Sequence, residues 1–72
     1  MLATYKDLRK GDRIWFYGAE VIIKKVDRSI ENYTVFEIRP CTSVDRRILS
    51  EFYGTGWYGG YDSNKVSIYI IS

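Results

Sequence analysis

Four short segments rich in hydrophobic, β-branched and aromatic residues, separated by polar turns, are predicted to be β-strands. The segments are residues 13–17, 20–26, 33–39 and 65–71. Turn-forming residues separate them: Gly11–Asp12 precedes the first, Gly18–Ala19 supplies a tight hairpin turn, and residues 28–32 precede the third. Pro40 ends the third segment because it has no amide hydrogen for a strand ladder.

The second segment does not alternate regularly. Val21 and Ile23 fall on one face of a regular strand, whereas Ile22 and Val26 fall on the other. A strand covered on both faces, or one that bends between two sheets, has this pattern. Residues 1–12, before the first segment, are expected to be a lead-in whose Leu8 packs on the core.

The first segment has hydrophobic residues on both faces, whereas the last segment alternates clearly. Ile14 and Phe16 share one face of the first segment, opposite Trp15 and Tyr17, and one of these pairs must belong to the core. In the last segment the residues expected to face inward are Val66, Ile68 and Ile70.

The period changes after Pro40, where residues 43–53 are predicted to form a short helix. Thr42 to Asp45 has the form of a capping box, with Asp in place of the usual Glu. Gly54 is placed to end the helix as a left-handed cap. The apolar side of the helix would consist of Val44, Ile48, Leu49 and Phe52.

These elements predict one mainly β domain over residues 1–72, with one short helix and the order β-β-β-α-β. A short extra strand inside residues 57–61 is an option. Strands of this number and length suit a small, strongly bent antiparallel sheet or a partly open barrel. The alternative is an α+β arrangement in which the helix lies across an open sheet.

The segment LRKGDRIWFYGAEVIIKKV, residues 8–26, resembles the opening of small SH3-like barrels, including KOW-type and Tudor-type modules. In those barrels a leucine, a Gly-Asp turn and an apolar strand lead into a hairpin. The resemblance implies an SH3-like barrel in which the helix is an insertion before the last strand. Members of this group bind nucleic acids, modified peptides or proline-rich ligands, so the resemblance informs the fold more than the function. The matching positions are Leu8, Gly11, Asp12, Ile14, Gly18, Val21 and Val26.

The composition argues against catalysis. The chain has no histidine, which removes the commonest general base and most zinc sites. Its nine acidic residues are spread singly, and its glycines fit neither a P-loop nor a dinucleotide-binding fingerprint. We therefore expect a protein that is not an enzyme and holds neither a metal nor a cofactor.

The single cysteine, Cys41, cannot form an internal disulfide, so the sequence does not indicate an oxidising compartment. Polar first residues and short apolar runs predict neither a signal peptide nor a membrane helix, and we expect a soluble, cytoplasmic protein. Cys41 precedes the predicted helix, whose N-terminus would lower the pKa of the thiol. The simpler interpretation is a small, partly buried side chain.

Aromatic residues make up 17% of the chain, more than so small a core can readily enclose, so some rings should form a contact surface. The segment GTGWYGGY, residues 54–61, carries Trp57, Tyr58 and Tyr61 among four glycines. These rings either form an exposed platform for a partner, or Trp57 folds back to close one end of the barrel. Arg46 and Arg47, on the outer side of the predicted helix, either contact anionic groups or are simply solvated.

A second candidate surface combines Trp15 and Tyr17 with Arg13, Lys24 and Lys25, a basic and aromatic set suited to single-stranded nucleic acid. The simpler interpretation, which we prefer, places Trp15 in a second core layer under the helix and leaves the lysines solvated.

Three hypotheses follow. The leading one is a protein–protein inhibitor or adaptor that binds through Trp57, Tyr58, Tyr61, Arg46 and Arg47. Compact binders of this size are common among virus-encoded and plasmid-encoded proteins that block host machinery. The second is a nucleic-acid-binding SH3-like module, and the third is an oligomer that sequesters a small ligand or nucleotide. No membrane partner is expected, and a homodimer would form through the last strand if that strand is an unpaired edge.

Overall fold

The computed structural model describes residues 2–52 and 61–71, and in these ranges the strands form one antiparallel sheet. The order of strands across the sheet is β1-β6-β2-β3-β4-β5. The prediction of a mainly β protein with one short helix is confirmed. The elements are β1 (Leu2–Thr4), the 3-10 turn η1 (Tyr5–Asp7), β2 (Arg13–Phe16), β3 (Ala19–Asp27), β4 (Tyr33–Pro40), α1 (Ser43–Phe52), β5 (Tyr61–Asp62) and β6 (Val66–Ile70).

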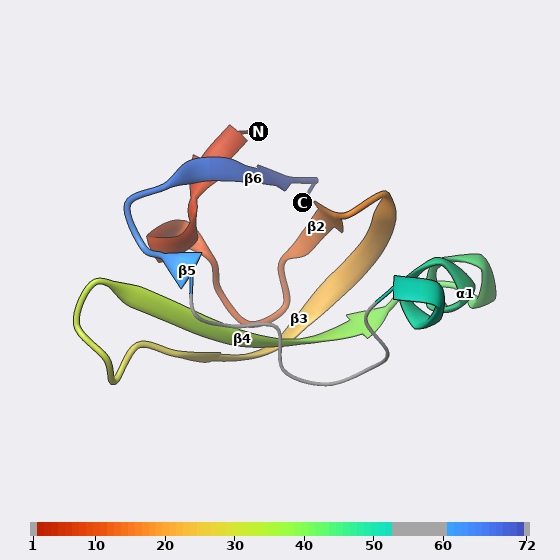
Figure 1. The fold of residues 1–72 in the computed structure, drawn as a ribbon, viewed down its shortest axis with the longest axis horizontal. Coiled ribbons are helices and arrows are strands. Elements are labelled where there is room, and N and C mark those ends of the chain that lie inside the picture. Colours follow the sequence, from red (N-terminus) through yellow and green to blue (C-terminus); the bar gives the residue numbers. More distant parts are fainter. Residues whose placement is uncertain (1, 53–60, 72) are drawn as a thin grey trace.

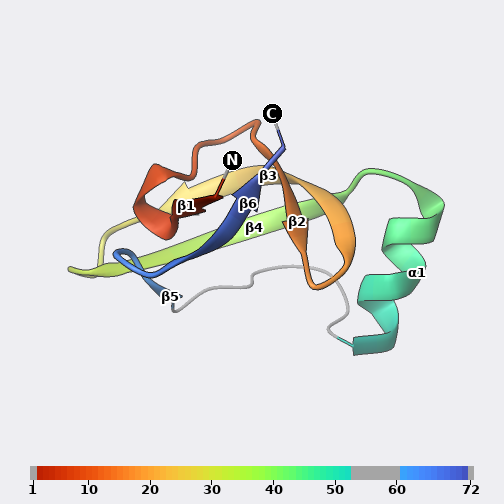
Figure 2. The ribbon, with the colours of Figure 1, turned by 90° about the horizontal axis from the view of Figure 1, so that it is seen from above.

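The sheet is strongly bent, so that β6 faces β4 across the interior while β2 and β3 form the wall between them (Figure 1). The outer strands β1 and β5 do not pair with each other, so the sheet does not close into a barrel. Helix α1 lies at one end of the sheet, beyond the β2–β3 hairpin (Figures 1 and 2). It does not lie across an open sheet, as the alternative α+β arrangement required.

The core fills the inside of this bend. The predicted anchor Leu8 and the pair Ile14 and Phe16 belong to it, so Trp15 and Tyr17 are on the outer face of β2. Burial of a large apolar side chain contributes about 1.5–3 kcal/mol, which makes these residues the main source of stability. The largest fully buried side chains are Phe36, Leu8, Ile14, Ile23, Leu49, Ile68, Val21 and Thr34.

The N-terminal segment is more ordered than the predicted lead-in, because β1 pairs with β6. Ala3 is the partner of Ile68, and Thr4 is the partner of Val66, so Ser67 is an extra residue in β6. Val66, on the far side of this irregularity, is exposed, and its predicted inward position is wrong.

Strand β6 is an interior strand, since β1 pairs with one of its edges and β2 with the other. The expectation that the last strand offers an unpaired edge for a homodimer is therefore wrong. Long-range pairing causes the difference, because β1 is too short to be recognised as a strand from its own three residues.

A β-bulge explains the irregular pattern of β3. Ile23 pairs with Ile38 and Val26 pairs with Phe36, so the chain has one more residue on β3 than on β4 between these pairs. The extra residue, Lys24, returns Val26 to the core side, so the predicted placement of Val26 opposite Ile23 is wrong.

The turn between β2 and β3 is one residue earlier than predicted. Phe16 pairs with Ala19, and the two residues between them have positive φ: 51° at Tyr17 and 83° at Gly18. Positive φ at both central positions is the type I′ turn that suits the twist of a two-residue hairpin. A left-handed conformation costs a residue other than glycine about 1–2 kcal/mol, so Tyr17 is held in place by its surroundings.

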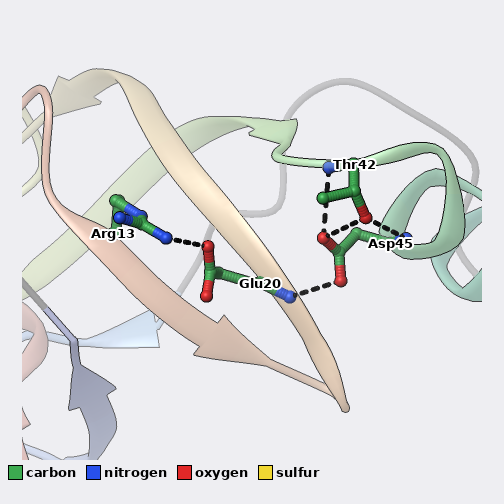
Figure 3. A network of polar contacts seen from close by, with 4 residues as sticks. All are labelled: Arg13, Glu20, Thr42 and Asp45. Atoms are coloured by element: carbon green, nitrogen blue, oxygen red, sulfur yellow. Dashed lines mark hydrogen bonds and ion pairs between the residues drawn. The ribbon is translucent and has the colours of Figure 1, made fainter.

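The predicted capping box at the start of α1 is present (Figure 3). The Asp45 amide donates to Thr42 Oγ1 at 3.2 Å, and Asp45 Oδ2 accepts from the Thr42 amide at 3.1 Å. The other carboxylate oxygen, Oδ1, accepts from the amide of Glu20 at 3.0 Å, which ties the helix to the start of β3. This bond from Glu20 is the main reason why the pKa of Asp45 is lowered, and the bonds from Thr42 add to it.

The orientation of α1 follows from that contact rather than from its apolar residues alone. Asp45 is buried, whereas Val44 beside it is exposed, so the prediction that Val44 faces inward is wrong. Leu49 is buried and Ile48 packs against the core, as predicted.

Candidate functional site

The leading candidate site is only partly within the described residues. Trp57 and Tyr58 lie outside them, as does Gly54. Tyr61 is half-buried at the start of β5. Arg46 and Arg47 are exposed on α1, at the far end of the sheet from η1.

The aromatic residues of the second candidate surface are exposed. Trp15 is 48% exposed and Tyr17 is 55% exposed, so the preferred interpretation of Trp15 as a second core layer under the helix is wrong. The structure brings these two rings together with Tyr61, which we had assigned to a different surface.

These three residues line a pocket of about 300 Å³, which we call the aromatic pocket. Its described lining has five ring side chains, one cation, and the smaller residues Ser67 and Ile68. The rings are Tyr5, Trp15, Phe16, Tyr17 and Tyr61, and the cation is Lys65.

The aromatic pocket lies where β2 and β6 separate. The two strands pair at Ile14–Ile70 and at Trp15–Tyr69, and the next residues along, Phe16 and Ile68, are not register partners. Beyond this point β2 enters its hairpin turn while β6 continues along β1 (Figure 2). The pocket is therefore a gap in strand pairing, and side chains from both strands line it.

A chain of ring contacts connects the aromatic pocket to the core. Phe36, which is fully buried, is 5.7 Å from Tyr61 and 6.0 Å from Tyr5 between ring centroids, both in stacked geometry. Tyr5 and Tyr61 stack on each other at 4.7 Å. On the other side, Phe16 meets Phe36 edge-on at 5.6 Å and Tyr17 edge-on at 4.7 Å. Ring pairs of this kind contribute about 0.5–1.5 kcal/mol each beyond the area they bury, so the lining is held in a fixed arrangement.

Ser63 fixes the wall that carries Tyr61 and Lys65. Its carbonyl accepts from the Lys6 amide at 2.9 Å, and its amide donates to the Asn32 carbonyl at 2.8 Å. Its hydroxyl shares a hydrogen bond of 2.8 Å with Thr34, whose side chain is fully buried. One serine thus links β5 to η1, to the β3–β4 turn and to β4.

Arg28 fixes the neighbouring η1 turn, whose Tyr5 stacks on Tyr61. Its Nη2 donates to the carbonyls of Tyr5, Lys6 and Leu8 at 3.0, 2.8 and 2.6 Å, which holds the η1 turn against the end of β3. The roles of Arg28 and Tyr5 could not be predicted from local sequence patterns, because both depend on contacts between segments more than 20 residues apart.

An exposed apolar row adjoins the aromatic pocket through Trp15. Leu2 and Trp15 are both register partners of Tyr69, so the three side chains lie side by side across β1, β6 and β2. Leu2 is 62% exposed and Tyr69 is 50% exposed. We call Leu2, Tyr69 and Trp15 the outer row.

The cations of the second candidate surface do not line the aromatic pocket among its described residues. Arg13 forms an ion pair with Glu20 (Figure 3), and this contact raises the pKa of Arg13. Lys24 forms an ion pair with Glu37 at 3.3 Å. Two of the three cations that were expected to attract phosphate therefore have a carboxylate beside them.

Cys41 is half-buried close to Arg13 and Glu20. Burial raises the pKa of its thiol, and Glu20 raises it further, whereas Arg13 opposes the shift. The hypothesis of a lowered thiol pKa is wrong, because the loss of solvent outweighs the nearby positive charge.

Within residues 2–52 and 61–71, no group of three His, Cys, Asp or Glu side chains is arranged to hold a metal ion. The helix in this part of the chain is too short and too polar to cross a membrane. No protein-family model matches the chain, and neither a similar curated protein nor a similar solved structure was found. The SH3-like resemblance of residues 8–26 stays a prediction, and the site is interpreted from its own geometry.

Proposed function

We propose that this is a non-enzymatic binding protein, an inhibitor or adaptor, that recognises a partner protein by taking one of its side chains into the aromatic pocket. The observation that carries the proposal is the group of five rings around a volume of about 300 Å³, next to the exposed outer row. A pocket that encloses an anchor side chain beside an exposed apolar surface is the usual anatomy of a protein–protein hot spot.

The charge of the lining favours one class of ligand. Lys65 is the charged group among the described lining residues, and a cation at this position disfavours a second cation on the rings. An apolar or proline side chain with an acidic neighbour suits the pocket better, because the neighbour can pair with Lys65. Extended proline-containing segments dock in aromatic-lined grooves elsewhere, which supports this choice.

The rigidity of the lining also supports binding. Phe36 holds Tyr5, Phe16 and Tyr61 from behind, so these rings lose little freedom when a ligand enters. Tyr17 keeps an unfavourable backbone conformation at the pocket edge. Strained residues of this kind are concentrated at binding sites.

A displayed library of random peptides, selected on the purified protein, tests the proposal. Selected peptides should contain a proline or a large apolar residue next to Asp or Glu, and they should shift the indole N–H signal of Trp15 in NMR spectra. Trp15→Ala should weaken their binding by about tenfold or more, as expected for a hot-spot ring.

Lys65→Gln separates the charge effect from the apolar one. It should weaken the binding of acidic peptides about two- to fivefold, which corresponds to an exposed charge pair. Lys10→Gln is the matched control, since it removes the same charge from a position that does not line the pocket, and it should leave binding unchanged. A library that yields no binder, or binders insensitive to both Trp15→Ala and Lys65→Gln, would overturn the proposal.

A further inference from the structure

A second concave surface lies on β3, and basic residues line it. Two adjoining hollows of about 510 and 380 Å³ share Lys10, Lys24 and Lys25, and Arg39 lines the smaller one. We call the surface formed by these four residues the lysine groove.

The β-bulge creates the lysine groove. In a regular strand, neighbouring residues point to opposite faces, so one of two adjacent lysines would point inward. Here Ile23 and Val26 both pack on the core side, and Lys24 and Lys25 between them are both exposed. The bulge thereby places two adjacent positive charges on one side of the sheet.

Two neighbouring segments add the other cations. The Gly11 amide donates to the Ile23 carbonyl at 2.8 Å, which places the turn that carries Lys10 beside the bulge. On the other edge of β3, Arg39 is the register partner of Ile22. The four cations thus come from the turn before β2, from β3 and from β4.

Carboxylates offset only part of this charge. Glu37 pairs with Lys24, and Asp27 lines one of the two hollows. Asp27 accepts a hydrogen bond from the Ser29 amide at 2.8 Å, which lowers its pKa and occupies one of its oxygens. Asp12 accepts a hydrogen bond from the Arg9 amide at 2.9 Å. The four cations and the carboxylates of Glu37 and Asp27 together give the lysine groove two net positive charges. The whole chain has the same formal net charge of +2.

We propose that the lysine groove binds the phosphate backbone of double-stranded nucleic acid without reading its base sequence. Three of its four cations are lysines, which act on phosphates as point charges, and contacts of this kind suit a phosphate backbone that is bound without reading its bases. This function is additional to the one proposed for the aromatic pocket and does not depend on it.

One observation favours a duplex over a single strand, and a second favours close contact with a phosphate of either. The described lining contains no aromatic ring, so an unpaired base has no ring to stack on. Gly11 has a φ of +95° and open space where a Cβ would be, which lets a phosphate approach the backbone closely. The nucleic-acid hypothesis from the sequence is therefore revised: Arg13, Trp15 and Tyr17 are left out, and Lys10 and Arg39 are added.

The expected affinity is modest and depends on salt. Neutralising about two or three phosphates gives a slope of roughly −2 to −3 for the logarithm of the binding constant against the logarithm of salt concentration. A rise from about 50 to 200 mM salt should therefore weaken binding about 15- to 60-fold.

Fluorescence anisotropy with a short labelled DNA duplex of mixed sequence tests the proposal. The double variant Lys10→Gln/Lys25→Gln should bind the duplex about tenfold or more weakly, with a salt slope that is closer to zero by about two. The double variant Lys6→Gln/Lys65→Gln removes the same charge from exposed positions outside the groove and should bind within about twofold of wild type. All four substituted lysines are exposed, and circular dichroism confirms that each variant is folded.

Two other probes distinguish the alternatives. The same duplex sequence as a single strand, and polyglutamate as a model of an acidic protein, should both bind more weakly than the duplex. Tighter binding of either probe, equal losses in the two double variants, or no response to salt would each overturn the proposal.

Discussion

The aromatic pocket and the lysine groove are two surfaces of one sheet, and each arises where strand pairing becomes irregular. At the pocket, β2 and β6 separate after two paired positions, and the core rings Tyr5 and Phe16 line the gap. At the groove, an extra residue in β3 turns two neighbouring lysines to the same side while pairing with β4 continues. The first irregularity lets core rings line a pocket. The second changes only which side chains lie on the surface of the sheet.

This difference predicts how each surface depends on stability. Three of the pocket rings, Tyr5, Phe16 and Tyr61, are in contact with Phe36, so the pocket depends on an intact core. The lysine side chains are exposed, so they can be replaced with little effect on folding. Mutations of the core should therefore affect both surfaces, and mutations of surface positions should affect one surface at a time.

The largest expected effect is that of Phe36→Ala, which removes the ring that joins both sides of the pocket. The loss should be about 3–5 kcal/mol in the free energy of unfolding, measured by urea denaturation. Val35→Ala, next to it on the opposite face and only half-buried, should cost about 1 kcal/mol or less. Similar losses in the two variants would contradict the central position of Phe36.

Arg28→Lys should separate the two surfaces. The substitution keeps the charge but removes the planar group that reaches three carbonyls of the η1 turn, at a cost of about 1.5–3 kcal/mol. Peptide binding to the aromatic pocket should weaken because Tyr5 loses its support, while duplex binding to the folded protein should not change. Equal weakening of both ligands would show that Arg28 acts on the whole fold rather than on the pocket wall.

Asp45 tests a part of the molecule that belongs to neither surface. Its pKa is lowered in the folded protein, so its ionised form stabilises the fold at pH values above the ordinary carboxyl pKa of about 3.9. That contribution is lost as the pH falls through the lower, folded-state pKa. Asp7 and Asp27 shift in the same direction, so wild-type stability should decline at acid pH.

Asp45→Asn should lower the stability by about 0.5–2 kcal/mol at neutral pH, as expected for a weakened helix cap. Its stability should also fall less steeply than that of wild type as the pH is reduced. Urea denaturation at neutral pH and at several acid pH values measures both effects. Parallel curves for wild type and variant would show that the Asp45 carboxylate does not contribute to acid sensitivity.

The smallest change in stability is expected for Tyr17→Asn. Asparagine adopts positive φ more readily than tyrosine, which should gain about 1 kcal/mol, but the edge contact with Phe16 is lost at a similar cost. Stability should therefore stay within about 1 kcal/mol of wild type, while peptide binding weakens clearly. Gly18→Ala, at a φ of 83° and with open space around it, should instead destabilise by about 1 kcal/mol or more without removing a ring.

Much of the fold was predictable from local patterns. The strands at residues 13–17, 20–26, 33–39 and 65–71 and the helix at 43–53 match observed elements to within about two residues, which is the usual uncertainty at element ends. The capping box of Thr42 and Asp45 was also predictable, because both residues lie within one helical turn. These signals need only neighbours in the sequence.

The remaining features depend on contacts between distant segments. Strand β1 exists because β6 lies beside it, and α1 turns Asp45 inward because the Glu20 amide is there to bond it. The candidate site shows the same division: Trp15 and Tyr17 were named as candidate residues, although Trp15 was expected in the core, and Tyr5 and Lys65 join them only through the folded sheet. Hydrophobic periodicity does not report such partners.

The interior place of β6 has a consequence for the synthesis of the chain on the ribosome. Leu2 pairs with Tyr69, so β1 and β2 emerge early but stay without their common neighbour until residue 70 has been made. Unpaired strand edges are templates for association between chains, and contacts so distant in sequence form slowly. A nascent or prematurely terminated chain that lacks residues 66–70 would expose the edge of β1 and the edge of β2 that β6 otherwise covers.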